Sequence, residues 1–129
     1  MKHVLVSGLA TVDMIFYMDE LPAFEKKYRA KKALITTGGN AANASIAISR
    51  LGGKASLLTQ VGQDFFGNLI MTELAAEKVE TNRIDQKENI STAYSSIIID
   101  KKGARQIINY RTDNLDFSKL SLGNQINYE

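Results

Sequence analysis

The sequence has no cysteine, one proline and one histidine. Without cysteine, a disulfide framework and any thiolate metal site are excluded. No apolar run reaches the roughly 20 residues that cross a bilayer, and the first run, Val4–Val6, is too short for a secretory signal peptide. We therefore expect a cytoplasmic protein. The single histidine, His3, fits the edge of a strand better than it fits a catalytic base.

Charge is nearly balanced, with 16 lysine and arginine residues against 14 aspartate and glutamate residues. The basic residues are scattered, and the densest group, residues 26–32, is typical of a solvated strand or loop. This pattern indicates neither a nucleic-acid partner nor a membrane partner. With 129 residues, of which 44% are hydrophobic, the chain can bury one core, so we expect one domain over residues 1–129.

The most informative stretch runs from Thr37 to Gly62. Gly38-Gly39 can adopt positive φ and lets backbone approach a ligand closely, because glycine has no Cβ. Residues 41–51 are rich in alanine and isoleucine, which predicts a helix closed by Gly52-Gly53. A Gly-Gly turn that opens a helix presents free N–H groups and the positive end of the helix dipole.

Asn40 and Asn43 lie three residues apart, so both amides face one side of the first helical turn. Asn40 alone is explained by the preference of asparagine for helix N-caps. Asn43 stands in so apolar a run that we expect the helix to be buried, and a buried amide needs hydrogen-bond partners. The pair fits either a pocket floor for a hydroxyl-rich ligand or a capped structural helix.

Val4–Val6 followed by Ser7-Gly8 predicts a buried parallel strand that ends in a turn. A dinucleotide fingerprint needs three glycines here, and only Gly8 is present. Asp13 follows this strand, at the edge where open α/β sheets bind ligands, although a turn aspartate that bonds its own backbone is the alternative. Four further elements are expected: a core strand over 55–62, a helix over 65–74 capped by Asp64, a hairpin of 94–99 and 106–110, and a weak strand or loop over 28–35.

The run Gly38-Gly39-x-Ala41-x-Asn43-x-Ser45 is followed by Gly52 and, ten residues later, by Gly62. This spacing resembles the first signature of the ribokinase (PfkB) family of carbohydrate kinases, and its Gly-Gly-Asn-x-x-Asn variant is most similar to the ketohexokinase branch. The resemblance covers essentially the whole chain, which corresponds to the front part of such a kinase. It implies an α/β ribokinase-like fold: a parallel central sheet flanked by helices, with a small β lid over the sugar, formed by approximately residues 12–37 and 91–111.

The resemblance also implies a sugar site. The aspartate at the position of Asp13 accepts hydrogen bonds from adjacent sugar hydroxyls, and an ionised carboxylate can accept two such bonds. Arg105 matches a ketohexokinase-like arginine that reaches the sugar, with a solvated hairpin arginine as the alternative, and Thr92 matches a position at the base of the lid. The implied substrate-binding residues are Asp13, Gly38, Gly39, Asn40, Asn43 and Arg105.

Phosphoryl transfer also needs a base and an anion cradle with Mg²⁺. In the family both come from a Gly-Ala-Gly-Asp motif further along the chain, and no Gly-x-Gly-Asp occurs in these 129 residues. The resemblance implies ATP and Mg²⁺ for the full-length kinase, with no catalytic, cofactor or metal residue in this chain. We therefore expect a truncated chain that is inactive alone and exposes a sheet edge.

The asparagine pair and Arg105 favour a ketose or a sugar acid as substrate. Three alternatives stay open. The first is a nucleoside kinase of the same superfamily, and the second is a non-catalytic sugar-binding module. The third is an assembly module that forms a homodimer through the β lid.

Overall fold

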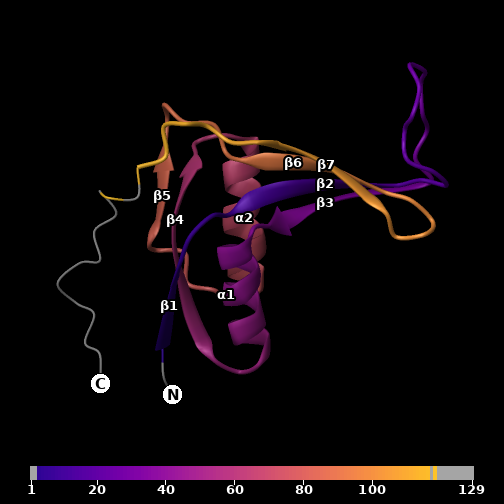
Figure 1. Ribbon diagram of the computed structural model, residues 1–129. Coiled ribbons are helices and arrows are strands. Elements are labelled where there is room, and N and C mark those ends of the chain that lie inside the picture. Colours follow the sequence, from indigo (N-terminus) through magenta and orange to yellow (C-terminus); the bar gives the residue numbers. More distant parts are fainter. Residues whose placement is uncertain (1–2, 117, 119–129) are drawn as a thin grey trace.

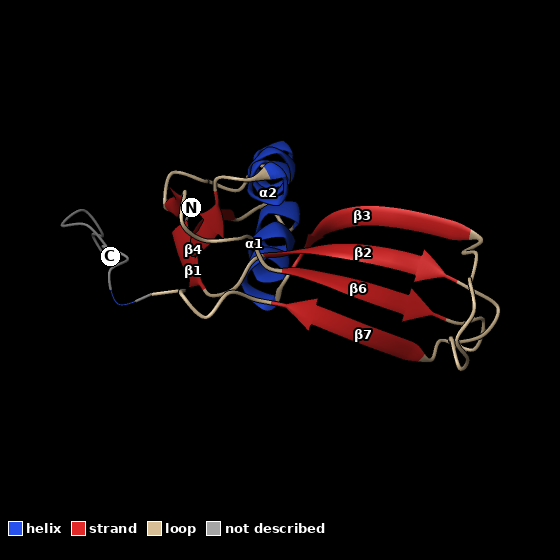
Figure 2. Cartoon of the chain, turned by 90° about the horizontal axis from the view of Figure 1, so that it is seen from above, coloured by secondary structure: helices blue, strands red, loops and turns tan. Residues whose placement is uncertain are grey.

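The computed structural model describes residues 3–116 and 118. In this part of the chain, two helices cover one face of a parallel sheet, and a four-stranded sheet projects from the far side of the helices (Figure 1 and Figure 2). The elements are β1 (His3–Ser7), β2 (Thr11–Tyr17), β3 (Lys32–Gly38), α1 (Asn40–Arg50), β4 (Lys54–Gly62), α2 (Phe65–Ala76), β5 (Ile84–Lys87), β6 (Tyr94–Ile99) and β7 (Arg105–Tyr110).

The parallel sheet has the strand order β1-β4-β5. Its central strand β4 is buried from Ala55 to Gly62, a continuous run that is typical of a parallel strand in a core. Leu57 of this strand packs with Ile70 and Leu74 of α2, and all three side chains are fully buried. The core therefore lies between the parallel sheet and the helices.

The four-stranded sheet has the order β3-β2-β6-β7. β2 runs antiparallel to β3 and parallel to β6, and β6 runs antiparallel to β7. Two segments far apart in sequence thus form one sheet, with Asp13 of β2 level with Thr36 of β3 and Ser95 of β6. Figure 2 shows this sheet extending well beyond the helices.

Most predicted elements are confirmed, including both helices and the hairpin. The first strand forms as β1, but the expectation that it is buried is wrong, because Val4 is exposed and Leu5 and Val6 are only partly buried. The weak strand predicted over 28–35 begins later and extends further, as β3.

The sequence patterns do not predict β2, because its apolar residues do not alternate with polar ones. They do not predict β5 either, because three of its four residues are polar. The expectation of a buried first helix is wrong, because only Ala41, Ala42 and Ser45 of α1 are buried.

The end of α1 and the start of α2 have the capping residues that the sequence predicts. Gly52 adopts φ +86 just after α1, and its N–H donates to the Ser49 carbonyl, so glycine closes the helix. At the start of α2, Asp64 is the N-cap and accepts a hydrogen bond of 2.8 Å from the Gly67 N–H. No helix within the described residues is long and apolar enough to cross a membrane.

Candidate functional site

A hollow of about 640 Å³ lies where the end of β1, the first turn of α1 and the four-stranded sheet meet. It collects polar groups from three elements beside an apolar wall. The lining residues are Val6, Ser7, Gly8, Leu9, Thr11, Asp13, Gly39, Asn40, Ala41, Ala44, Ser95, Ile97 and Ile107.

Asp13 is the acidic residue among the lining side chains. It lies within β2 and is half-buried, and its Oδ1 accepts a hydrogen bond of 3.2 Å from the Thr11 hydroxyl. Because Asp13 pairs within a strand, the alternative of a turn aspartate does not apply. A Cβ on Gly38 would lie 2.0 Å from Asp13 Oδ2, so the carboxylate occupies the space that only glycine leaves free.

Gly39 joins β3 to α1 with φ +92, a left-handed conformation that favours glycine. A Cβ there would lie 2.5 Å from the Leu9 carbonyl oxygen, so this turn also packs tightly against the segment before β2. The first helical bond runs from the Asn43 N–H to the Gly39 carbonyl. The N–H groups before it have no acceptor within the helix and lie at the end that borders the hollow.

The two asparagines do not line the same hollow. Asn40 lines the hollow of Asp13 together with Ala41 and Ala44. Asn43 lines a second hollow of about 410 Å³, beside Ile46 and residues of β3 and α2. A step of 100° per residue places Asn43 about 60° from Asn40, on the side away from Ala44. Both amides are exposed, so the inference from a buried Asn43 is not supported.

Arg105 lies further along the four-stranded sheet, away from the hollow. It begins β7 opposite Ile99, whereas Ser95, the neighbour of Asp13, pairs with Asn109. Four residues of strand correspond to about 13 Å. Arg105 is exposed and is not among the residues that line the hollow, although Ile107, which lines it, lies only two residues away on the same face of β7.

Sequence reasoning missed the contributions of Ser95, Ile97 and Ile107. The hairpin itself is predicted, and alternation within it places residues 95 and 97 on one face. The sequence gives no signal for the pairing of β6 with β2, and this pairing brings that face beside Asp13. The pairing joins segments about 80 residues apart in the chain, and no local pattern specifies it.

Helix α2 fixes both halves of the four-stranded sheet. Near its end, Glu73 Oε2 accepts a hydrogen bond of 2.6 Å from the Thr37 N–H of β3. At its start, Asp64 binds the N–H and hydroxyl of Thr92, at 2.8 and 2.7 Å. Partial burial raises the pKa of the Asp64 carboxyl, but the hydrogen bonds from Thr92 and from the first turn of α2 outweigh it and leave that pKa below its usual value.

Three comparisons place these features among known proteins. The family described as pfkB family carbohydrate kinase matches residues 1–128. A ribokinase from Mus musculus is 30% identical over 105 residues, which are 81% of this chain and 32% of that protein. A protein from Agrobacterium tumefaciens that has been provisionally assigned as a ribokinase has a TM-score of 0.80 at 34% identity, over 84% of this chain and 36% of the other.

A crystal structure of the fructokinase from Xylella fastidiosa with bound ATP has a TM-score of 0.68 at 29% identity, over 85% of this chain and 33% of the other. These matches confirm the predicted α/β fold. The chain spans about a third of the length of the curated relatives it matches.

Proposed function

The chain belongs to the pfkB family of carbohydrate kinases, and from this premise we propose that it is the sugar-recognition part of an ATP-dependent sugar kinase. In the proposed reaction the γ-phosphate of ATP is transferred to a sugar hydroxyl. The observation that carries the proposal is that the Asp13 carboxylate and the first turn of α1 line one hollow.

Each part of the hollow suits a polyol. The Asp13 carboxylate accepts hydrogen bonds from two neighbouring hydroxyls, and such charge-assisted bonds are stronger than neutral ones. The exposed Asn40 amide offers a donor and an acceptor. The first turn of α1 leaves N–H groups free at the edge of the hollow, and Ile97 and Ile107 cover the apolar C–H face of a sugar ring. Gly38 does not line the hollow, because the Asp13 carboxylate fills the space beside it.

We propose a ketose or a sugar acid as the substrate. Asn40 supplies amide contacts to a keto or hydroxyl oxygen. Arg105 lies two residues beyond Ile107, about 7 Å along the strand, a distance that an extended arginine side chain spans. A carboxylate at the outer end of the ligand would meet its guanidinium, which pairs with carboxylates through two parallel hydrogen bonds.

Among residues 3–116 and 118, no group of three or more His, Asp or Glu side chains is placed to hold a metal ion. We propose that the 129-residue chain alone does not transfer phosphate, because no Gly-x-Gly-Asp occurs in its sequence. ATP-dependent turnover by the pure chain, lost in Asp13→Ala, would contradict this expectation.

Self-association through the four-stranded sheet belongs to the same proposal. β7 lies at the edge of the sheet, and all six of its residues are exposed. Ile107 has 56% of its surface exposed to solvent, and Ile108 has 65%. An edge strand whose outer side is unpaired, and which exposes two isoleucines, favours pairing with a second copy. Light scattering of the wild type and of Ile108→Lys tests this, and a monomer at all concentrations would exclude it.

The test of sugar recognition is a thermal melt with ketoses, aldoses, sugar acids and nucleosides. A ligand at a hundredfold excess over Kd stabilises by about 2.7 kcal/mol, which is several degrees at this chain length. We expect a shift with one sugar class that is lost in Asp13→Asn and kept in the exposed control Glu88→Gln. A shift that persists in Asp13→Asn would exclude the role of Asp13.

A nucleoside kinase is the second candidate. The observation that favours it is the apolar wall of Val6, Leu9, Ile97 and Ile107, which suits a base attached to the sugar. A shift with nucleosides that exceeds the shift with the free sugar would select this candidate. A shift with sugars in a naturally short chain without turnover would instead favour a non-catalytic binding module.

A further inference from the structure

The β6–β7 hairpin supplies Ser95, Ile97 and Ile107 to the hollow, so its position sets the shape of that wall. Hydrophobic packing against the core reaches only the base of the hairpin. There the Tyr94 ring lies 5.3 Å from that of Phe66, whereas β7 is exposed along its whole length. Pairing with β2 holds β6 along its length, and side-chain contacts fix the two ends of the segment that carries the hairpin.

The first anchor lies just before β6. The Thr92 side chain is 2% exposed, and its hydroxyl makes two hydrogen bonds, accepting from the Gly62 N–H at 2.8 Å and donating to Asp64 Oδ1 at 2.7 Å. The Thr92 N–H donates to Asp64 Oδ2. A Cβ on Gly62 would lie 2.4 Å from the Ile90 carbonyl oxygen, so the two backbones are in direct contact here.

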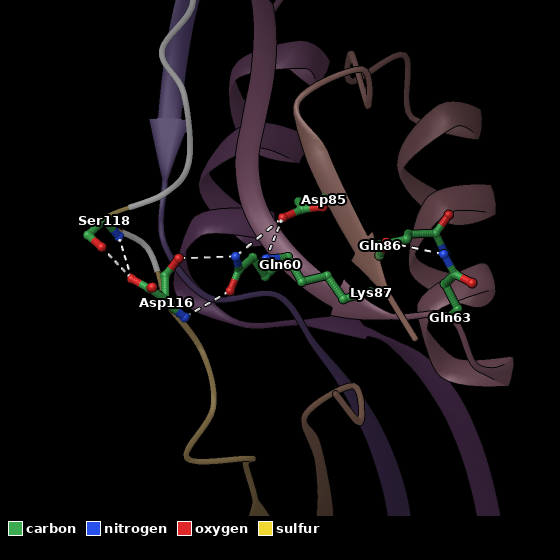
Figure 3. Close-up of polar contacts among 7 residues, drawn as sticks. All are labelled: Gln60, Gln63, Asp85, Gln86, Lys87, Asp116 and Ser118. Atoms are coloured by element: carbon green, nitrogen blue, oxygen red, sulfur yellow. Dashed lines mark hydrogen bonds and ion pairs between the residues drawn. The ribbon is translucent and has the colours of Figure 1, made fainter. Parts of the chain in front are cut away.

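The second anchor lies beyond β7, at Asp116. The buried side-chain amide of Gln60 makes hydrogen bonds with both the N–H and the carbonyl of Asp116 (Figure 3). Gln60 Oε1 accepts from the Asp116 N–H at 2.9 Å, and Gln60 Nε2 donates to the Asp116 carbonyl at 3.1 Å and to Asp85 Oδ2 at 3.3 Å. Gln60 is 3% exposed, and both ends of its amide are satisfied.

Both anchors start from one short segment. Gln60, Gly62 and Asp64 are alternate residues at the carboxyl end of β4 and in the turn that follows. They hold the chain where it enters the hairpin, at Thr92, and where it has left it, at Asp116. The end of the most deeply buried strand is thereby linked to the exposed hairpin that covers the hollow.

We infer that Thr92 and Gln60 are positioning residues, which hold the β6–β7 hairpin over the hollow and thereby set the affinity for its ligand. This inference rests on the proposed function, because the ligand whose affinity is measured is the sugar proposed above. Neither side chain lines the hollow, so each acts through Ser95, Ile97 and Ile107.

The variants are Thr92→Val, which keeps the shape and removes the hydroxyl, and Gln60→Met, which keeps the length and removes the amide. Thr92→Ser restores a hydroxyl, and Thr72→Val is the control, because its hydroxyl bonds only within α2, to the Asn68 carbonyl. Hydrogen exchange is measured without ligand, and Kd is measured by calorimetry well below each melting temperature, with the sugar that stabilises the wild type.

We expect Thr92→Val and Gln60→Met to accelerate exchange in residues 94–110 and to raise Kd about tenfold, since each loses two or three hydrogen bonds. Thr92→Ser should return Kd to within about twofold of the wild type, and Thr72→Val should leave it unchanged. A lower melting temperature with unchanged Kd in Thr92→Val and Gln60→Met would mean that both residues are merely structural, and would overturn the inference.

The exchange measurement separates this inference from the proposed function. If no sugar binds the wild type, the proposed function fails. Faster exchange confined to residues 94–110 would then still support the anchors. Exchange that is unchanged, or that rises equally in α1 and β4, would overturn them.

Discussion

Leu57 in β4 is fully buried, whereas Ile108 in β7 has 65% of its surface exposed, although both are aliphatic residues inside a strand. The contrast extends along both strands, because eight successive residues of β4 are buried and all six of β7 are exposed. Apolar packing against the helices therefore holds the parallel sheet. The four-stranded sheet is held by strand pairing and, at its base only, by polar contacts and by the packing of Val12 and Tyr94 against the core.

This difference separates two properties of the molecule. Substitutions in the parallel sheet change the free energy of unfolding, because they remove packed apolar surface. Substitutions in the four-stranded sheet change where its side chains lie relative to the hollow. The two regions are linked at the base of the four-stranded sheet, by polar contacts of Glu73 to Thr37 and Asp64 to Thr92, and by Val12, which is fully buried in the same core as Leu57. Beyond this base, the outer part of the four-stranded sheet has no helix packed against it (Figure 2).

The largest expected effect tests the burial contrast directly. Leu57→Ala should lower the free energy of unfolding by about 2–5 kcal/mol, because it leaves a cavity in the core. Ile108→Ala should change it by no more than about 0.5 kcal/mol. Urea unfolding followed by circular dichroism measures both. Equal losses would mean that the exposed face of β7 is covered in solution.

A smaller effect is expected inside the four-stranded sheet, at Gly38 of β3. Gly38→Ala should cost about 1–3 kcal/mol, because the new Cβ overlaps the Asp13 carboxylate. In an Asp13→Ala background the same substitution should cost much less, and the double-mutant cycle measures this coupling. Gly103→Ala measures backbone strain without a clash, since Gly103 has φ +84 in open space, whereas Gly38 has no positive φ and its cost comes from the overlap alone.

The same contrast explains what the sequence predicts. The buried elements carry strong local signals: the apolar run of residues 55–62 and the Asp64 cap both predict their structures correctly. β2 lacks such a signal, because its partners β3 and β6 determine its burial. Within the site, Asp13, Gly39 and Asn40 meet in one hollow, but no pattern reveals that Asn43 and Arg105 lie outside it.

A pH effect is expected from Asp64, whose carboxylate caps α2 and accepts two hydrogen bonds from Thr92. The pKa of the Asp64 carboxyl is lower in the folded protein than in the unfolded chain, where the pKa of an aspartate is about 3.9. Its stabilising contribution is therefore complete above that unfolded value and is lost as pH falls through the lower folded value. The difference in stability between wild type and Asp64→Asn should be constant near neutral pH and shrink in acid. A difference independent of pH would mean that the carboxylate charge contributes nothing.

The smallest effect on stability is expected at Arg105. Arg105→Ala removes an exposed side chain at the outer end of the sheet and should change the free energy of unfolding by less than about 0.5 kcal/mol. Its effect on binding should depend on the ligand. A sugar acid loses its guanidinium partner, so its Kd should rise about tenfold, the cost of one or two charge-assisted bonds.

The Kd of a neutral ketose should stay within about twofold, because Asp13 and Asn40 remain in the hollow. Calorimetry with matched pairs of sugar and sugar acid measures both, and Lys102→Ala, on the turn before β7, controls for the loss of local positive charge. Equal loss for both ligands would place Arg105 in sugar binding itself. No loss for either would leave it a solvated hairpin residue, and the preference for a sugar acid would lose its support.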